Sequence, residues 1–158
     1  EDEAEEADVL EYDVLVVGGG PAGLSTAIRL RQLCEEHDND LSVCLIDKGS
    51  YVGAHILSGN VFEPRALNEL FPNWKEMEAP LTTPVTEDSM LILSESSSFK
   101  VPNMFLPKSV DNHGNYIISL SQLCQWMGEQ AEELGVEILE GIAGNKVLFN
   151  DDGSVAGV

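Results

Sequence analysis

The residues whose types and spacing suggest chemistry are three glycines and one aspartate. Gly18, Gly20 and Gly23 form a G-x-G-x-x-G pattern, and Asp47 follows 24 residues after the last glycine. In such a pattern the first glycine makes a tight turn, the second lets the backbone approach a diphosphate, and the third packs a helix closely on a strand. Backbone N–H groups at a helix start and the positive end of its dipole favour the diphosphate. We therefore predict a dinucleotide site in which Asp47 accepts hydrogen bonds from the adenosine ribose hydroxyls.

Asp47 limits which dinucleotides can bind but does not select a single one. A 2′-phosphate beside this carboxylate would be repelled, which disfavours NADP, whereas NAD and FAD both remain possible. The alternative is a glycine-rich turn that binds no ligand, and the flanking strand and helix favour the binding interpretation over it. The long segment after Asp47 exceeds what a simple dinucleotide fold needs before its third strand, and this favours a flavin.

The elements expected around the glycines form a β-α-β unit. Residues 12–17 end in a continuous apolar run, which is typical of a parallel strand covered on both faces. Pro21 suits the first turn of a helix whose apolar residues recur at helical spacing up to a polar end at 35–39. Residues 43–46 form a second all-apolar strand. This order predicts a parallel sheet with a right-handed crossover.

The middle of the chain is irregular in pattern. Residues 48–115 show little periodicity and contain six prolines, so we expect long functional loops there. A short helix at 63–70 and an extended piece at 90–93 are the regular elements expected within this segment.

Regular pattern returns near the C-terminal end. Ser119 and Gln122 have the spacing of a helix capping box, and an apolar stripe continues to Gly135, which suits the end of the helix. A third strand is expected at 136–139, followed by a hairpin within 146–158 around an Asn-Asp-Asp-Gly turn. Because this pattern stops in mid-sheet, we expect the chain to be a piece of a longer protein.

Charge and composition exclude some classes of function. With 8 basic and 28 acidic residues the formal net charge is −20, which argues against nucleic acid as a partner. Seven of the acids lie within residues 1–11, which we interpret as an acidic, disordered tail. This start resembles neither a secretory signal nor a transit peptide, so we expect a cytosolic protein or one whose presequence has been removed. No apolar run approaches the roughly 20 residues of a membrane-spanning helix.

The three cysteines at positions 34, 44 and 124 lack the spacing of a zinc or iron-sulfur motif. We expect small buried thiols and no metal ligands among the residues of this chain.

Beyond these patterns, the sequence resembles known flavoproteins. The stretch Val16–Ser25 begins like many FAD-dependent oxidoreductases of the glutathione reductase type. Five later stretches resemble the electron transfer flavoprotein-ubiquinone oxidoreductase family: Gly53–Gly59, Leu70–Trp74, Ala79–Asp88, Asn112–Ile117 and Trp126–Glu132. The resemblance runs from about Tyr12 to Val158. It implies an α/β fold: a Rossmann-like FAD-binding domain of the glutathione reductase type, with a parallel sheet and a β-meander that starts near the C-terminus. Residues 12–158 would be the N-terminal, incomplete part of that domain.

The resemblance also implies an activity for the whole protein. Members of the family are electron-transferring-flavoprotein dehydrogenases of the respiratory chain, which contain FAD and one [4Fe-4S] cluster and pass electrons from reduced electron transfer flavoprotein to ubiquinone. They lie on the membrane surface, at the matrix face of the mitochondrial inner membrane or at the bacterial cytoplasmic membrane. The cluster ligands and most of the quinone site are absent from this chain, so we expect it to be inactive alone.

The residues expected to contact FAD come from four segments of the chain, and no acid-base or nucleophilic set is expected. Small residues are favoured because they let the backbone approach the cofactor. Val147 is included by family analogy alone, and Asp47 stands where many relatives carry glutamate. The candidates are Val17, Gly18, Gly19, Gly20, Pro21, Ala22, Gly23, Asp47, Lys48, Gly53, Ala54, Ser58, Gly59 and Val147.

Other residues have two interpretations. His55 could lie beside the flavin or quinone or make a local hydrogen bond, and His113 suits a structural role in a turn. A set of apolar residues could dip into the membrane or cover the sheet, and the second interpretation is favoured. That set comprises Val61, Phe62, Leu67, Leu70, Phe71 and Trp74.

Two alternative functions remain open. One is a geranylgeranyl reductase-like enzyme or another flavin-dependent reductase or hydroxylase, because such enzymes share the N-terminal motif. The other is a non-catalytic FAD-binding fragment. Clustered cysteines in the rest of the protein would favour the ubiquinone oxidoreductase over the first alternative.

Overall fold

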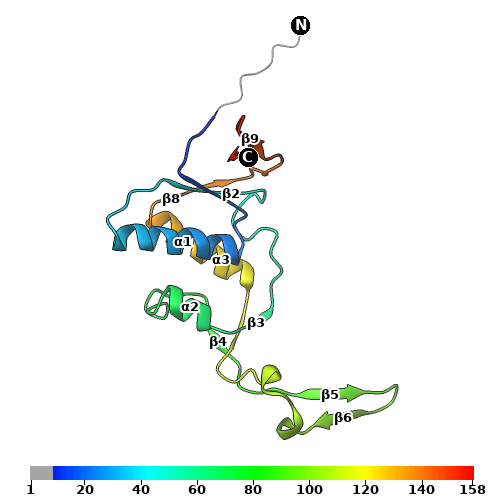
Figure 1. The fold of residues 1–158 in the computed structure, drawn as a ribbon. Helices are drawn as coiled ribbons and strands as arrows, with labels where there is room; N and C mark the ends of the chain where they lie inside the picture. The colour runs from blue at the N-terminus through cyan, green and yellow to red at the C-terminus, as the bar shows by residue number, and fades with distance from the viewer. Residues whose placement is uncertain (1–8) are drawn as a thin grey trace.

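The computed structural model describes residues 9–158, so most of the acidic tail expected at 1–11 lies outside the described residues. Figure 1 shows the elements in chain order. They are β1 (Val14–Val17), α1 (Pro21–Glu36), β2 (Val43–Asp47), β3 (Asn60–Phe62), α2 (Arg65–Leu70), β4 (Thr83–Pro84), β5 (Met90–Leu93), β6 (Ser98–Val101), the 3₁₀ turns η1 (Asn103–Phe105) and η2 (Lys108–Val110), β7 (Tyr116–Ile118), α3 (Leu120–Glu133), β8 (Val136–Glu140), β9 (Leu148–Phe149) and β10 (Val155–Gly157).

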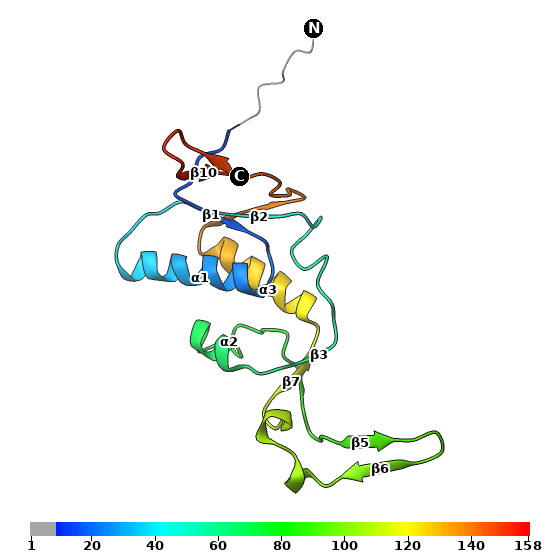
Figure 2. The ribbon, with the colours of Figure 1, turned by 45° about the vertical axis from the view of Figure 1, so that its right-hand side comes forward.

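A parallel sheet of β1, β2 and β8, in that order, forms the centre of the fold. Its register pairs Val14 with Val43 and Asp47 with Glu140. α1 and α3 lie side by side and cover one face of the sheet (Figures 1 and 2). The predicted β-α-β unit, its parallel pairing and the third strand are therefore confirmed.

The two faces of β1 differ, which corrects the prediction that this strand is covered on both. Val14 and Val16 pack against the core, whereas Leu15 is 36% exposed and Val17 56% exposed. β2 is buried at every position from Val43 to Ile46. The physical reason is position: β1 is the edge strand of this sheet and pairs with β2 alone, whereas β2 lies between β1 and β8, whose side chains flank its own.

The two long helices agree with the sequence pattern. α1 buries Leu24, Ala27 and Ile28 against the sheet. α3 starts after Ser119, whose side chain accepts a hydrogen bond from the Gln122 N–H at 3.4 Å. The glycine expected at the end of α3, at position 135, has a φ of +84°, the left-handed conformation that commonly stops a helix.

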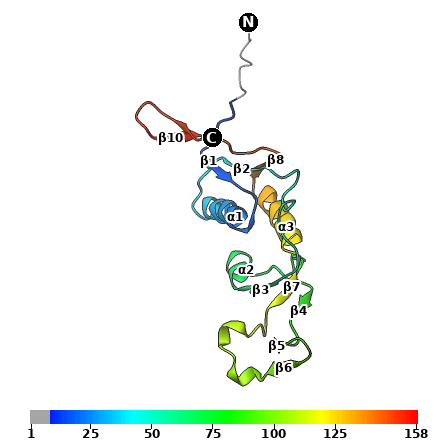
Figure 3. The same cartoon turned by 90° about the vertical axis from the view of Figure 1, so that its right-hand side faces the viewer.

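The middle segment forms smaller antiparallel units below α1 and α3 (Figures 1 and 3). β3, β7 and β4 make one three-stranded sheet, and β5 pairs with β6 in a hairpin that projects from the end of the molecule. The expected extended piece at 90–93 is confirmed as β5, and the expected helix at 63–70 is α2, which starts two residues later. β4 and β7, of two and three residues, carry too little pattern of their own to be found from sequence.

The C-terminal hairpin is also confirmed. β9 and β10 pair antiparallel, and Asn150 closes the turn by donating its N–H to the Ser154 carbonyl oxygen at 2.8 Å. The hairpin lies on the side of the parallel sheet opposite α1 and α3 (Figure 2), as the start of a β-meander would.

Most of the apolar residues between positions 61 and 74 belong to the core rather than to the surface. Leu67, Phe71 and Trp74 are buried, and Phe71 meets Trp126 edge to face with ring centroids 5.3 Å apart. Val61, by contrast, is 47% exposed. Within residues 9–158, no helix has the length and apolar character needed to cross a membrane.

Candidate dinucleotide-binding site

The glycine-rich turn leaves β1 and runs into α1. The Gly18 N–H donates to the Ile46 carbonyl oxygen at 2.8 Å, which extends the parallel ladder one residue beyond β1. Gly18 has a φ of +110°, a conformation that residues with side chains rarely adopt. The Gly19 N–H donates to Oδ2 of Asp47 at 2.7 Å. The turn is therefore held against the end of β2 through both backbone and side-chain atoms.

α1 begins without a side-chain cap. Gly20 is its N-cap, and the first intrahelical bond runs from the Leu24 N–H to the Gly20 carbonyl oxygen at 3.0 Å. The N–H groups of Ala22 and Gly23 thus have no acceptor within the helix. A Cβ at Gly20 would meet no atom within 4 Å, so the space around this position is open. Free N–H groups at the positive end of a helix suit a diphosphate.

Gly23 allows the helix to approach the turn. A Cβ at this position would overlap the Gly18 carbonyl oxygen and would lie 3.3 Å from Cγ1 of Val16. Only glycine fits here without a backbone shift, and this is the packing role that the sequence pattern predicts for the third glycine.

Asp47 links two backbone segments at the end of β2. Its Oδ2 accepts from Gly19, as described above, and its Oδ1 accepts from the Gly49 N–H at 2.7 Å. The side chain is partly exposed, and an ionised carboxylate has about four acceptor sites, so capacity remains for ribose hydroxyls. Lys48, the next candidate, is exposed.

The loop after Asp47 is fixed by the neighbouring elements. The Gly49 carbonyl oxygen accepts from the Gly141 N–H at 2.7 Å, and the Ser121 hydroxyl donates to the Gly53 carbonyl oxygen at 2.8 Å. Gly53 has a φ of +90°, and a Cβ there would lie 2.7 Å from the Ser121 carbonyl oxygen. The close approach to α3 therefore explains why position 53 is a glycine, whether or not a cofactor lies nearby.

The remaining candidates are spread more widely. Ala54 is partly buried, and Ser58 and Gly59 are exposed where the loop approaches β3. Gly59 has a φ of +83° and donates its N–H to the Ile118 carbonyl oxygen at 3.2 Å. Val147, immediately before β9, is 43% exposed. The structure thus gathers residues 17–23 and Asp47 at adjoining strand ends, whereas contact of any candidate with a cofactor stays a prediction.

The two histidines singled out from the sequence are both exposed. The backbone N–H of His113 donates to Oδ1 of Asp111 at 3.0 Å. This bond within the turn supports a structural role for His113.

Four residues near the site were missed from sequence. Gly49 and Glu140 hold the loop after β2, and Gly144 packs so closely that a Cβ would lie 3.0 Å from Cγ1 of Val17. Asn60, the first residue of β3, buries Oδ1 without a hydrogen-bond partner in the described part of the chain. The Asp-x-Gly spacing at 47–49 was an available signal for Gly49, whereas the others depend on tertiary packing.

The cysteines are buried, as predicted. Burial raises the pKa of the Cys124 thiol to about 11. Burial, with the nearby Glu137 carboxylate, also raises the pKa of the Cys44 thiol. Since the thiolate is the reactive form, both thiols are held in the unreactive state at neutral pH. The described residues contain no group of three or more His, Cys, Asp or Glu side chains placed to hold a metal ion.

Comparison with known proteins agrees with this geometry. Residues 16–75 match the family model of the NAD(P)-binding Rossmann-like domain, which covers the glycine turn, α1 and Asp47. Among solved structures, a geranylgeranyl bacteriochlorophyll reductase-like protein from Thermoplasma acidophilum superposes with a TM-score of 0.64 at 22% identity, over 92% of this chain and 34% of that chain. The chondrochloren halogenase CndH, a variant of FAD-dependent halogenases, gives a TM-score of 0.58 at 17% identity, over 93% and 34% of the two chains. These likenesses show the fold.

Curated relatives are much more similar in sequence. The electron transfer flavoprotein-ubiquinone oxidoreductase of Pseudomonas aeruginosa is 58% identical over 97% of this chain. The mitochondrial proteins of the same name from Bos taurus and Homo sapiens are 56% and 55% identical over 94% of it. The chain spans 28%, 24% and 24% of these three relatives, about a quarter of their length. The chain is therefore a homologue, over nearly all of its residues, of part of the electron transfer flavoprotein-ubiquinone oxidoreductases, and it has the Rossmann-like fold of FAD-dependent oxidoreductases.

Proposed function

We propose that this chain forms the ADP-binding part of the FAD site in an oxidoreductase that passes electrons from reduced electron transfer flavoprotein to ubiquinone. The observation that carries the proposal is the 58% identity to a relative of that name over 97% of the chain. The uncapped start of α1 and the Asp47 carboxylate at the adjoining strand end suit the diphosphate and adenosine ribose of such a dinucleotide. The role in the respiratory chain is part of the same proposal.

Each part of the site would have a separate task. The N–H groups at the start of α1 would bind the diphosphate, and Asp47 would accept hydrogen bonds from the ribose. Bound FAD supplies the redox chemistry through its flavin ring, while protein groups position and tune it. The residues of this chain therefore bind and orient, and we assign none of them a catalytic proton transfer. The [4Fe-4S] cluster would belong to the full-length protein, with ligands from outside this chain.

The experiment that tests the proposal uses the full-length protein. We expect a flavin absorption spectrum after purification, and bleaching of that spectrum by reduced electron transfer flavoprotein followed by recovery with a soluble ubiquinone analogue. A colourless protein that reduces no quinone in this assay would refute the proposal.

We further propose that the protein works at a membrane surface, either the matrix face of the mitochondrial inner membrane or the bacterial cytoplasmic membrane. The β5–β6 hairpin supports this, because five of its apolar side chains are half or more exposed on a projecting element (Figure 1). They are Met90, Leu91, Ile92, Leu93 and Phe99. An apolar patch of this kind marks an interaction surface, and exposed apolar side chains can enter the lipid interface. The apolar set at 61–74 is mostly buried and gives this proposal little support.

Liposome flotation of the full-length protein tests the membrane proposal. The double variant Ile92→Ser with Phe99→Ser should float at least tenfold less than the wild type, because it removes two exposed apolar side chains without disturbing the core. Thr86→Ser, at an exposed position outside the hairpin, is the matched control. Equal flotation of all three proteins would contradict a role for the hairpin.

A second candidate function is a geranylgeranyl reductase-like enzyme, which the superposition on the Thermoplasma acidophilum protein favours at the level of fold. Iron analysis of the full-length protein separates it from the first, because the first proposal includes a [4Fe-4S] cluster and the second does not. A third candidate is a non-catalytic FAD-binding fragment. Measuring the FAD affinity of the 158 residues alone, with Gly20→Val as the control, tests whether they bind the cofactor without the rest of the protein.

A further inference from the structure

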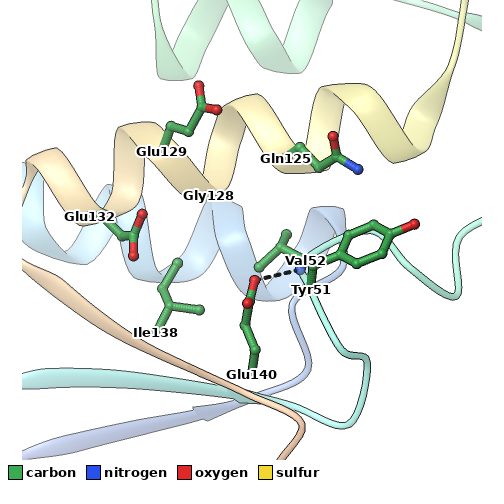
Figure 4. Close-up of a pocket in the computed structure, with 8 residues that line it drawn as sticks. All are labelled: Tyr51, Val52, Gln125, Gly128, Glu129, Glu132, Ile138 and Glu140. Carbon is green, nitrogen blue, oxygen red and sulfur yellow. Dashed lines mark hydrogen bonds between the residues drawn. The ribbon is translucent and has the colours of Figure 1, made fainter.

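A second carboxylate holds the loop that follows β2. Glu140, at the end of β8, lies opposite Asp47 in the parallel register. Its Oε1 accepts a hydrogen bond from the Val52 N–H at 2.8 Å, drawn as the dashed line in Figure 4. Asp47 accepts from Gly49 in the same loop. Two acids on adjoining strand ends therefore hold one loop by its backbone N–H groups.

The residues after Glu140 add to this hold. The Gly141 N–H donates to the Gly49 carbonyl oxygen at 2.7 Å, and the Ile142 N–H donates to the Asp47 carbonyl oxygen at 2.9 Å. The end of β8 thus contacts the first and fourth residues of the 49–52 segment as well as the backbone of Asp47 itself. The position of Asp47 and that of Glu140 are linked through this short network.

The Glu140 carboxylate is not buried, so its hydrogen bond from the Val52 N–H is not needed to compensate a buried charge. The Glu140 side chain lies at the rim of a hollow of about 330 Å³ between the loop, α3 and β8, and the residue is exposed (Figure 4). The hydrogen bond instead fixes the distance between the Val52 backbone and the end of β8.

We propose that Glu140 is a positioning residue of the dinucleotide site, which sets the loop at 48–53 and thereby the placement of the Asp47 carboxylate for the ribose. The inference rests on the proposed function, since it assigns Glu140 a task in FAD binding. Val52 is 5% exposed and lies against Gly128 of α3, so its side chain anchors the loop to the helix while its N–H aligns the loop with the sheet.

Three variants of the full-length protein test the proposal. Glu140→Ala removes the acceptor, Glu140→Gln keeps a carbonyl oxygen of the same reach, and Glu132→Ala removes a carboxylate that lines the same hollow from α3. The FAD dissociation constant is measured by quenching of flavin fluorescence. Amide hydrogen exchange at Val52 is measured on the FAD-free protein, with the Leu45 amide in the buried centre of β2 as the reporter of global opening.

We expect Glu140→Ala to speed exchange at Val52 about tenfold and to raise the FAD dissociation constant about tenfold, since a hydrogen bond to a charged group is worth at least one such factor. Exchange at Leu45 should stay within about twofold and Glu132→Ala within about threefold of the wild type, whereas Glu140→Gln should fall between the wild type and Glu140→Ala because a neutral acceptor makes a weaker hydrogen bond. This pattern cannot come from general destabilisation, which would speed exchange at both amides.

The outcomes that overturn the proposal are distinct from failure of the proposed function. If the wild type binds FAD and Glu140→Ala binds it equally well, the positioning role is wrong and the function stands. An effect of Glu132→Ala as large as that of Glu140→Ala would also overturn it, because charge in the hollow rather than the hydrogen bond would be responsible. If the wild type binds no FAD, the proposed function fails first, and the inference fails with it.

Discussion

The starts of α1 and α3 differ although both helices lie on the same face of the sheet. α3 is capped by Ser119, whose side chain accepts from the Gln122 N–H. α1 starts at a glycine, and no side chain caps it. Serine is among the preferred N-cap residues, and a helix start without a side-chain cap costs stability. The cap on α3 therefore stabilises the fold, whereas the uncapped start of α1 leaves N–H donors for a ligand. The comparison indicates that binding capacity at α1 is obtained at the expense of local stability.

The largest effect should come from filling the space where α1 meets the turn. Gly23→Ala places a Cβ against the Gly18 carbonyl oxygen and should lower the free energy of unfolding by about 3 kcal/mol, as overpacking against backbone does. Gly128→Ala is the matched control in α3, because its Cβ would lie at an ordinary 3.5 Å from Val52. Denaturant unfolding of both full-length variants measures the difference, and equal stabilities would show that the turn can adapt.

The next largest effect concerns the acid that faces the open helix start. Asp47→Ala removes the acceptor of two backbone N–H groups and should weaken FAD binding by about 2 kcal/mol, roughly thirtyfold in the dissociation constant. Asp47→Glu should recover most of the affinity because it retains the carboxylate. Flavin fluorescence titration measures the dissociation constants. An unchanged affinity of Asp47→Ala would show that Asp47 does not contribute to FAD binding.

Giving α1 a cap should reduce the contrast between the two helices. Gly20→Ser supplies the missing acceptor and should raise the free energy of unfolding by a few tenths of a kcal/mol in the FAD-free protein. The same side chain occupies the open space before the helix and should weaken FAD binding about tenfold, equivalent to roughly 1.4 kcal/mol. Opposite signs for stability and affinity are the signature to look for in thermal and fluorescence titrations. Normal FAD binding by Gly20→Ser would show that the diphosphate does not lie at the start of α1.

The smallest effect should come from opening α3 in the way that α1 is open. Ser119→Ala removes the cap and should cost about 1 kcal/mol of unfolding free energy. Thermal unfolding with and without FAD measures it, and the shift should be the same in both states because this helix start has no predicted role in binding. A selective loss of FAD affinity would mean that both helix starts serve the cofactor.

Prediction from sequence succeeded for the elements whose structure is determined by residues close together in the chain. The apolar runs at β1 and β2, the Pro21 start of α1 and the Ser119 cap of α3 each depend on neighbours within a few residues, and each was found. β1 shows the limit. Its unbroken apolar run predicted burial on both faces, whereas Leu15 and Val17 are exposed because nothing else in the described residues covers that face fully.

The sequence by itself determined the β-α-β unit, the turn with its three spaced glycines and the acid at the end of β2, because the backbone conformation of a turn and the period of a helix or strand are local properties. Only the tertiary structure decided that Asp47 bonds to Gly19, that Gly53 lies against Ser121, and that Glu140 reaches Val52. These contacts join residues that can be up to 88 positions apart, and their geometry follows from how the strands and helices pack, which no local pattern specifies.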